Sequence, residues 1–256
     1  MIKYLLEFFI GDIKMKWTEN YEIRYHDTHS NEIVGISNIF KLLQESAMRQ
    51  MRDCRPSYQD LVNQGKALIL SSMRVEMYSP VYPYEKISVK TWAGNNNKGF
   101  STIRSYQMYR GEELISESAS AWALVSIADK KLLRISEVDF TNYEGEDPLV
   151  LEGPMRVRIP SEVKMNLVGE YTVRYSDTDM NNHMNNTNYP DMIFNCLPKP
   201  ENKLVKSISI TYLKEAKIGD NLKIYMAYTD GKYFFRSIHE DGSVNVEGEI
   251  IVENIN

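Results

Sequence analysis

The chain has 256 residues, of which 43% are hydrophobic and 25% charged, and its formal net charge is −5. This length exceeds one average domain and suits two units of about 120 residues, each able to bury a core. The negative charge argues against nucleic acid as a general partner, because phosphate binding needs concentrated lysine and arginine. Two cysteines in unrelated contexts, Cys54 and Cys196, support neither a disulfide framework nor a zinc site, so a reducing cytoplasm is expected.

The first fourteen residues, MIKYLLEFFIGDIK, carry an apolar run that Glu7 interrupts, and no small-residue cleavage site follows. The run is shorter than the about 20 apolar residues that a membrane span needs, so no membrane role is expected. We predict an extra strand or helix turn here, or an over-long start with Met15 as the alternative initiator.

An amphipathic helix is predicted after the first short strand, with Ser37 or Asn38 as its cap. Its apolar positions, spaced by three and four residues, are Ile36, Ile39, Phe40, Leu43, Ala47 and Met51. Alternation then predicts strands, because every second residue is apolar or β-branched from Met73 to Met77 and from Ile87 to Thr91. Arg110-Gly111 is interpreted as the turn between two later strands.

Residues 141–167 hold three prolines and an acidic cluster without a sustained period, and are predicted to form a solvated surface connector. A second, shorter helix is expected from Tyr189 until Pro198 stops it. Alternation from Ile208 to Tyr212 predicts a further strand, and Asp241-Gly242 is the turn between the last two strands.

The two halves repeat one pattern. The segment YEIRYHDT at 21–28 recurs as YTVRYSDT at 171–178, and GFSTIR at 99–104 falls opposite GKYFFR at 231–236. This self-similarity indicates a duplicated domain. Each copy is one helix followed by antiparallel strands, an α+β arrangement that periodicity alone does not narrow further.

Polar residues of the types found in hydrolytic sites follow the second copy of the repeat. Asp179, Asn181 and His183 alternate with other residues, so an extended segment would point all three to one side. A carboxylate, a carboxamide and an imidazole form a plausible hydrolytic set, and the N-terminus of the next helix adds N–H donors for an oxyanion.

Polar residues also crowd ordinary turns, so the spacing alone leaves a structural interpretation open. The first half provides an internal control. Its equivalent positions are His29, Asn31 and Ile33, so the carboxylate is replaced and the imidazole is lost. A turn with a purely structural role would not need the aspartate and histidine of the second half. The difference therefore favours a functional site in the second half.

The stretch YSDTDMNNHMNNTNY at 175–189 resembles the signature of the acyl-acyl carrier protein (ACP) thioesterases, which end fatty-acid synthesis in plants and bacteria. Supporting similarity runs over most of the chain and includes Leu43 to Ala47, Glu85 to Trp92, Gly111-Glu112, Ala121-Trp122 and Thr211 to Glu215. The resemblance implies a tandem, or double, hot-dog fold, in which each antiparallel sheet wraps a central helix. It also implies a catalytic set of Asp179, Asn181, His183 and Glu215, with no cofactor and no metal.

Glu215 alone would be unremarkable, since a glutamate between Lys214 and Lys217 is usually a solvated ion-pair partner. Its first-half counterpart is Pro80. The family often has cysteine directly after this glutamate, whereas this chain has Ala216, which excludes a thiolate there. Cys196 lies on the apolar stripe of the short helix and is predicted to be a core residue.

The resemblance divides the chain into a catalytically degenerate hot-dog domain at 15–140 that lines the acyl pocket, a linker at 141–167 and a catalytic hot-dog domain at 168–256. It implies hydrolysis of fatty acyl-ACP thioesters to free fatty acid and holo-carrier, by direct attack of water. Glu215, with Asn181, would activate the water, His183 would carry the proton to the leaving thiolate, and Asp179 would fix the imidazole or polarise the carbonyl. Whether Glu215 or Asp179 is the general base stays open.

The implied partner is the acidic acyl carrier protein, which basic patches on this acidic chain would have to attract. The candidate patches are Arg49, Arg52 and Arg55, or Lys199, Lys203, Lys206 and Lys214. Three rival functions remain: an acyl-CoA thioesterase, a hot-dog dehydratase and a non-catalytic acyl-carrier binding module. The duplication already supplies the pairing that single hot-dog units obtain by dimerising, yet two chains can still form a homodimer.

Overall fold

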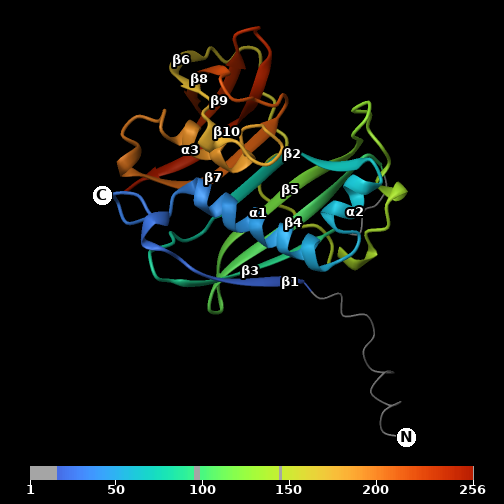
Figure 1. Ribbon diagram of the computed structural model, residues 1–256. Coiled ribbons are helices and arrows are strands. Elements are labelled where there is room, and N and C mark those ends of the chain that lie inside the picture. The colour runs from blue at the N-terminus through green and yellow to red at the C-terminus, as the bar shows by residue number, and fades with distance from the viewer. Residues whose placement is uncertain (1–15, 95–98, 144–145, 256) are drawn as a thin grey trace, which may run out of the picture.

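The structure is a computed structural model that describes residues 16–94, 99–143 and 146–255. The predictions for the first fourteen residues lie outside these ranges. The described residues form one ten-stranded sheet in which all neighbouring strands are antiparallel, in the order β1-β3-β4-β5-β2-β7-β10-β9-β8-β6 (Figure 1). The first half of the chain supplies five strands at one end of this order, and the second half supplies the other five.

The first half begins with a strand and two helices, β1 (Trp17–Glu22), α1 (Ile36–Asp53) and α2 (Tyr58–Asn63). Four strands follow: β2 (Lys66–Met77), β3 (Lys86–Ala93), β4 (Ser101–Arg110) and β5 (Glu113–Ser126). The second half is β6 (Asn166–Thr172), α3 (Tyr189–Phe194), β7 (Lys203–Tyr212), β8 (Asn221–Thr229), β9 (Lys232–His239) and β10 (Val244–Asn254). Each half therefore has a strand, a helix and four more strands, as the repeat predicts, and the first half adds the short helix α2. None of the described helices is long and apolar enough to cross a membrane.

Helix α1 lies across the sheet of the first half (Figure 1). All six apolar positions predicted for it are buried, with at most 9% of each residue exposed. The predicted cap is wrong, because the helix starts after Gly35 and neither side chain caps it. The Ser37 hydroxyl instead accepts a hydrogen bond from the Asp191 backbone N–H at 2.9 Å, and the Ser37 N–H donates to the Asp191 carboxylate at 3.2 Å. The start of α1 is thus tied to α3 of the other half.

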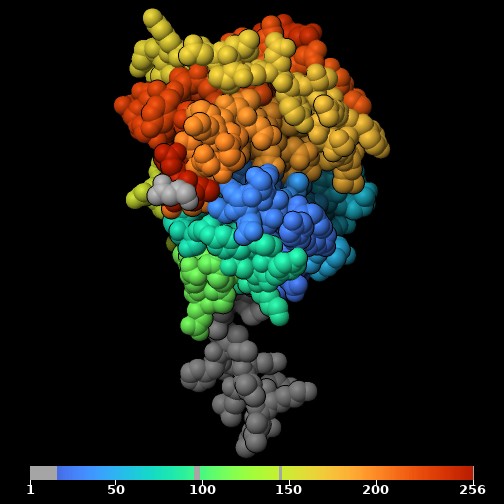
Figure 2. Space-filling view, turned by 90° about the vertical axis from the view of Figure 1, so that its left-hand side faces the viewer, coloured from blue at the N-terminus to red at the C-terminus, as the bar shows by residue number. Residues whose placement is uncertain are grey.

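The two halves join through β2 and β7, which pair side by side at the centre of the sheet. Met73 lies opposite Ile210 and Val75 opposite Ile208, and these four side chains belong to one continuous core. Figure 2 shows the second half, in orange and red, seated directly on the first half, in blue and green. Because the sheet and the core cross the junction, we expect the halves to fold as one unit.

The predicted turns and the shorter second helix are confirmed. Gly111 between β4 and β5 has φ 59°, and Gly242 between β9 and β10 has φ 82°, a region that favours glycine. Helix α3 has 6 residues against 18 in α1, and it ends at Phe194, before the predicted stop at Pro198. Helix α2 was not predicted. Its start carries a reciprocal cap in which the Ser57 side chain and the Asp60 carboxylate bond each other's backbone N–H groups.

The connector between the halves is bonded to the outer face of the sheet, which corrects the expectation of a simply solvated segment. The Trp92 indole donates to the Asp147 carbonyl at 3.3 Å, and the Ser105 hydroxyl accepts from the Leu149 N–H at 3.0 Å. Further along, Thr211 Oγ1 accepts from the N–H of Val157, which is 2% exposed. The connector therefore covers polar side chains of the sheet that would otherwise lack partners.

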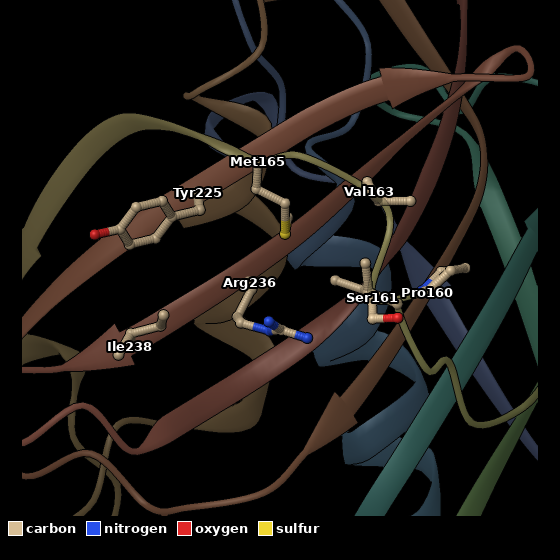
Figure 3. Close-up of a pocket in the computed structure, with 8 residues that line it drawn as sticks. Pro160, Ser161, Val163, Met165, Tyr225, Arg236 and Ile238 are labelled. Atoms are coloured by element: carbon tan, nitrogen blue, oxygen red, sulfur yellow. The ribbon is translucent and has the colours of Figure 1, made fainter.

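The connector also borders a pocket of about 190 Å³ on the outer face of β8 and β9 (Figure 3). Connector residues from 159 to 165 form one wall, and Tyr225, Arg236 and Ile238 form the other. The Arg236 guanidinium is held by the Glu247 carboxylate at 2.7 Å, so its charge is already compensated. This pocket offers no reactive group.

Candidate active site

Each copy of the repeat ends in a short 3₁₀ turn that a shared aspartate caps. The Asp177 carboxylate accepts a hydrogen bond from the Arg174 N–H at 2.8 Å, and Asp27 does the same for Arg24 at 3.0 Å. The threonine that follows in each copy donates to a carbonyl of the turn, at 2.8 Å in the second half and 2.7 Å in the first. The repeated aspartate is therefore structural, and any chemistry must come from the residues after it.

The segment after Asp177 is a tight turn, so the prediction that it is extended is wrong. The Asp179 N–H donates to the His183 carbonyl at 3.0 Å, and the Asn182 N–H donates to the Asp179 carbonyl at 3.0 Å. Asn182 has φ 61°, a left-handed conformation that asparagine tolerates. The first half has the same turn, with the His29 N–H bonded to the Ile33 carbonyl at 2.9 Å. Alternation of residue types failed as a guide here, because turn chemistry decides the backbone.

The turn brings His183 against Glu215. The His183 Nε2 lies 2.9 Å from Glu215 Oε2, and the two side chains are 23% and 49% exposed. The backbone supports this contact, since the Met184 N–H donates to the Ala216 carbonyl at 2.8 Å and His183 forms a bridge with Lys217. An imidazole and a carboxylate at this distance can exchange a proton, and both remain accessible to a ligand from solvent.

Asp179 and Asn181 lie in the same turn with different partners. The Asp179 carboxylate accepts a hydrogen bond from the Asn181 N–H at 2.8 Å. The Asn181 side-chain oxygen accepts one from the Tyr58 hydroxyl at 3.3 Å. Tyr58 belongs to α2, so the first half of the chain reaches the turn of the second half. The sequence does carry a signal for this helix, the Ser57-x-x-Asp60 cap, but nothing that connects Tyr58 to Asn181.

Asn245 is a residue that sequence reasoning missed, and it holds the segment that carries Glu215. Asn245 is fully buried in β10. Its backbone carbonyl accepts from the N–H groups of Leu213 at 2.9 Å and of Lys214 at 3.1 Å. Its side-chain amide donates to the Lys214 carbonyl and to the Tyr189 hydroxyl, the latter at 3.1 Å. Burial raises the pKa of Tyr189 to about 12, so this hydroxyl stays neutral near pH 7.

We expect Asn245→Ala to lower turnover by about 10-fold or more, because a shift of the Glu215 segment of about 1 Å would disturb its alignment with His183. The measurement is kcat and KM on a small acyl thioester. A loss in kcat at nearly constant KM fits a positioning role. Equal turnover in the variant and the wild type would show that the segment holds its place without this amide.

The first half has the same scaffold without the reactive side chains. The Val34 N–H donates to the Val81 carbonyl at 2.9 Å, as Met184 does to Ala216 in the second half. This correspondence puts Ile33 in the position of His183 and Pro80 in the position of Glu215. Neither residue can transfer a proton, so the first-half turn lacks the histidine–glutamate pair of the second half.

Cys196 lies in the core beside α3, as its position on the apolar stripe predicts. It is partly buried and packs against the main core, and its Sγ lies 3.5 Å from the Met192 carbonyl oxygen. Burial raises the pKa of the Cys196 thiol, which disfavours the thiolate that a nucleophile needs.

Solved structures with the same arrangement of helices and strands define the class of fold. An acyl-ACP thioesterase from Bacteroides thetaiotaomicron superposes with a TM-score of 0.83 at 22% identity, covering 92% of this chain and 97% of that one. A 12:0-ACP thioesterase from Umbellularia californica gives a TM-score of 0.73 at 14% identity, covering 93% and 96%. The chain therefore has the double hot-dog α+β fold, which confirms the predicted fold class.

Two family profiles cover most of the chain. The acyl-ACP thioesterase N-terminal domain matches residues 14–142, and the acyl-ACP thioesterase C-terminal domain matches residues 161–255. The chain belongs to the acyl-ACP thioesterase family, as the signature around His183 indicates.

Similar curated proteins come from plants. A chloroplastic palmitoyl-acyl carrier protein thioesterase from Gossypium hirsutum is 22% identical over 219 residues, which is 78% of this chain and 52% of that protein. The protein of the same name from Arabidopsis thaliana is 23% identical over 218 residues, 77% of this chain and 51% of its own length. The chain thus spans about half the length of the curated relatives that it matches.

Proposed function

We propose that this protein hydrolyses fatty acyl thioesters of acyl carrier protein, releasing a free fatty acid and the carrier thiol. The observation that carries the proposal is the 2.9 Å contact between His183 and Glu215, two residues brought together from separate segments of the second half. The first half, with the same backbone, has Ile33 and Pro80 at these positions. Family membership agrees with this reaction.

In the proposed reaction, a water oxygen attacks the thioester carbonyl carbon while Glu215 takes a proton from the water. Glu215 passes this proton to the imidazole of His183, which lies 2.9 Å away. The tetrahedral intermediate then expels the carrier sulfur as the C–S bond breaks, and His183 gives the proton to that sulfur. Asn181 orients the water or the carbonyl oxygen through its side-chain amide. No covalent enzyme intermediate is needed.

The contacts favour Glu215 over Asp179 as the general base. Glu215 bonds the imidazole directly, whereas the Asp179 carboxylate accepts a hydrogen bond within its own turn. We therefore assign Asp179 to holding the turn that presents Asn181 and His183.

We propose the same division of labour between the halves as the sequence suggests, with the first domain at 15–140 binding the acyl chain and the second at 168–256 carrying the chemistry. The hydrogen bond from Tyr58 to Asn181 supports this, since it brings α2 of the first half to the rim of the reactive turn. The acyl chain of a thioester bound at His183 would then extend from the thioester group toward the first half.

The function is tested by comparing how fast the purified protein hydrolyses the same acyl group on acyl carrier protein and on coenzyme A. A palmitoyl group suits the first comparison, since the similar plant proteins are named for it. We expect release of free palmitate from palmitoyl-ACP at a higher kcat/KM than from palmitoyl-CoA. A preference for the coenzyme A ester would favour an acyl-CoA thioesterase, and tight carrier binding without release would favour a binding module.

We propose that Arg52 and Arg55 form the docking patch for the acidic carrier. Arg52 lies in the last turn of α1 and Arg55 in the segment between α1 and Tyr58, whose hydroxyl contacts Asn181. Their side chains are 70% and 66% exposed and pair with Asp53 and Asp60. Exposed pairs of this kind are weakened by water and salt, so an incoming carboxylate can replace the partner. Arg49 is less available, because Glu19 and Glu45 both hold it.

Reversing both charges, Arg52→Glu with Arg55→Glu, is expected to lower kcat/KM for palmitoyl-ACP by about 10-fold or more at low salt, with a smaller loss at high salt. Turnover of a small acyl thioester without a carrier should stay the same. Lys199→Glu is the matched control, since Lys199 lies in the other candidate patch. A larger loss in the control than in the double variant would move the docking site to the lysine patch.

We propose the cytoplasm as the site of action, and the two cysteines, both free thiols, agree with a reducing compartment. A homodimer stays a prediction that sedimentation of the purified chain can test.

A further inference from the structure

A second cavity lies between the halves, at the turn formed by residues 29–33 of the first half. Its volume is about 230 Å³. The first half contributes residues of the turn, and the second half contributes the end of α3 and the start of β7; the lining includes His29, Asn31, Ile33, Phe194, Leu204 and Val205. Figure 1 shows α3 close to the starting end of α1, which is the end where this cavity lies.

The cavity occupies the place that corresponds to the candidate active site under the internal repeat. Both sites are built on the same turn, closed by the hydrogen bond from residue 29 to residue 33 in the first half and from 179 to 183 in the second. Both also lie against the other half of the chain, since Tyr58 of the first half reaches Asn181. The first-half turn therefore borders a cavity at the position that the repeat relates to the candidate active site.

The two sites are separate. The cavity lies at the beginning of α1, where Ile36 and Ile39 form part of its wall. The candidate active site contacts Tyr58, which follows the end of α1. Helix α1 has 18 residues and is therefore about 27 Å long at about 1.5 Å per residue.

The lining suits an amphiphile with a single apolar chain. Ile33, Phe194 and Val205 give an apolar wall, while His29 and Asn31 place polar atoms beside it. The His29 ring lies against Gly35, where a side-chain carbon would collide with the ring nitrogen Nε2, so a glycine is needed for this ring position. The cavity has room for on the order of eight water molecules at ~30 Å³ each. A space of this size suits a short or medium acyl chain.

We propose that this cavity is a non-catalytic binding site for an acyl chain, with its tail against Ile33, Phe194 and Val205 and its carbonyl or carboxylate end beside His29 and Asn31. The ligand is not hydrolysed there, because Ile33 and Pro80 replace the histidine and glutamate of the other turn. The choice of an acyl chain rests on the proposed function, but binding at this site requires no turnover.

The test uses the full chain and two probes, decanoate and decanoyl-pantetheine, which separate a free acid from a thioester as the source of the chain. Calorimetry gives the number of equivalents bound, with the thioester measured in the Glu215→Gln variant so that it persists. Leu204→Trp fills the cavity from a half-buried position, and we expect it to bind one equivalent fewer than its parent. Asn202→Trp, two residues away and exposed, is the matched control and should bind as its parent does.

A crystal structure with decanoate brominated at its terminal carbon gives an independent result. We expect bromine density among Phe194, Leu204 and Val205. If Leu204→Trp does not fold, Leu204→Asp places a charge against the chain and should have the same effect. Unchanged stoichiometry in a folded Leu204 variant, or bromine density at other places only, overturns the inference. Turnover of palmitoyl-ACP is measured separately, so loss of the second site and failure of the proposed function give different results.

Discussion

Glu215→Gln and His183→Ala are each expected to lower turnover of an acyl-ACP thioester by about 10² or more. Glutamine keeps the shape of the glutamate but cannot accept the proton of the attacking water, and alanine removes the acid that protonates the leaving sulfur. Because the two groups act as a pair at 2.9 Å, the double variant should lose little more than the worse single variant. Steady-state release of free fatty acid, assayed for the three proteins together, measures this.

The exposed residues His26 and Glu22 provide controls of the same residue types in the first half. His26→Ala and Glu22→Gln should retain turnover within about twofold, since neither contributes to a reacting contact. Thermal unfolding of all variants separates a chemical loss from misfolding. Near-wild-type turnover in both Glu215→Gln and His183→Ala would contradict the assignment.

Arg74→Ala is expected to lower the free energy of unfolding by about 3 kcal/mol or more, because it removes the buried guanidinium that lies between the carboxylates of Glu249 and Glu76. Arg74 of β2 and Glu249 of β10 are both 3% exposed and meet at 3.1 Å across the intervening strand β7. Glu76 also bonds Arg74, at 2.6 Å, and Lys232 bonds Glu249 at 2.7 Å. This ion network links the two halves on the outer face of the sheet, and urea unfolding measures its contribution.

The double variant Arg74→Met with Glu249→Leu removes the two most buried charges and should recover part of the lost stability, since Glu76 and Lys232, which each lose a partner, are the more exposed members of the network. Lys131→Ala is the surface control. It breaks an ion pair with Asp129 in which the lysine is 78% exposed, and should lower the free energy of unfolding far less than Arg74→Ala does. Equal costs for Arg74→Ala and Lys131→Ala would mean that the buried network does not stabilise the junction.

The spacing of apolar residues within single segments was sufficient to predict the main helices and strands. The apolar spacing from Ile36 to Met51 predicted α1, and alternation at Met73 and Ile208 predicted the two strands that join at the centre of the sheet. These predictions hold because burial of one face is decided by the segment's own sequence. The repeat itself predicted the correspondence of Ile33 with His183, which the shared turn hydrogen bonds reproduce.

Features that depend on partners distant in the sequence were not predictable in this way. The cap of α1 was missed because Ser37 bonds Asp191 in the other half. Tyr58 and Asn245 support the candidate site through contacts that span 123 and 31 residues, and no local pattern marks either one. The reactive turn was mistaken for an extended segment, since alternation of residue types says nothing about the left-handed backbone at Asn182.

The central claim is that the second half carries the hydrolytic site and the first half does not. The most direct measurement is a crystal structure of the protein with an acyl-pantetheine analogue in which a methylene group replaces the thioester sulfur. We expect the carbonyl carbon of the analogue to lie between His183 and Glu215, with the pantetheine arm extending to solvent beside Tyr58. An analogue whose carbonyl group lies only at the His29 turn, with the His183 turn empty, would contradict the account.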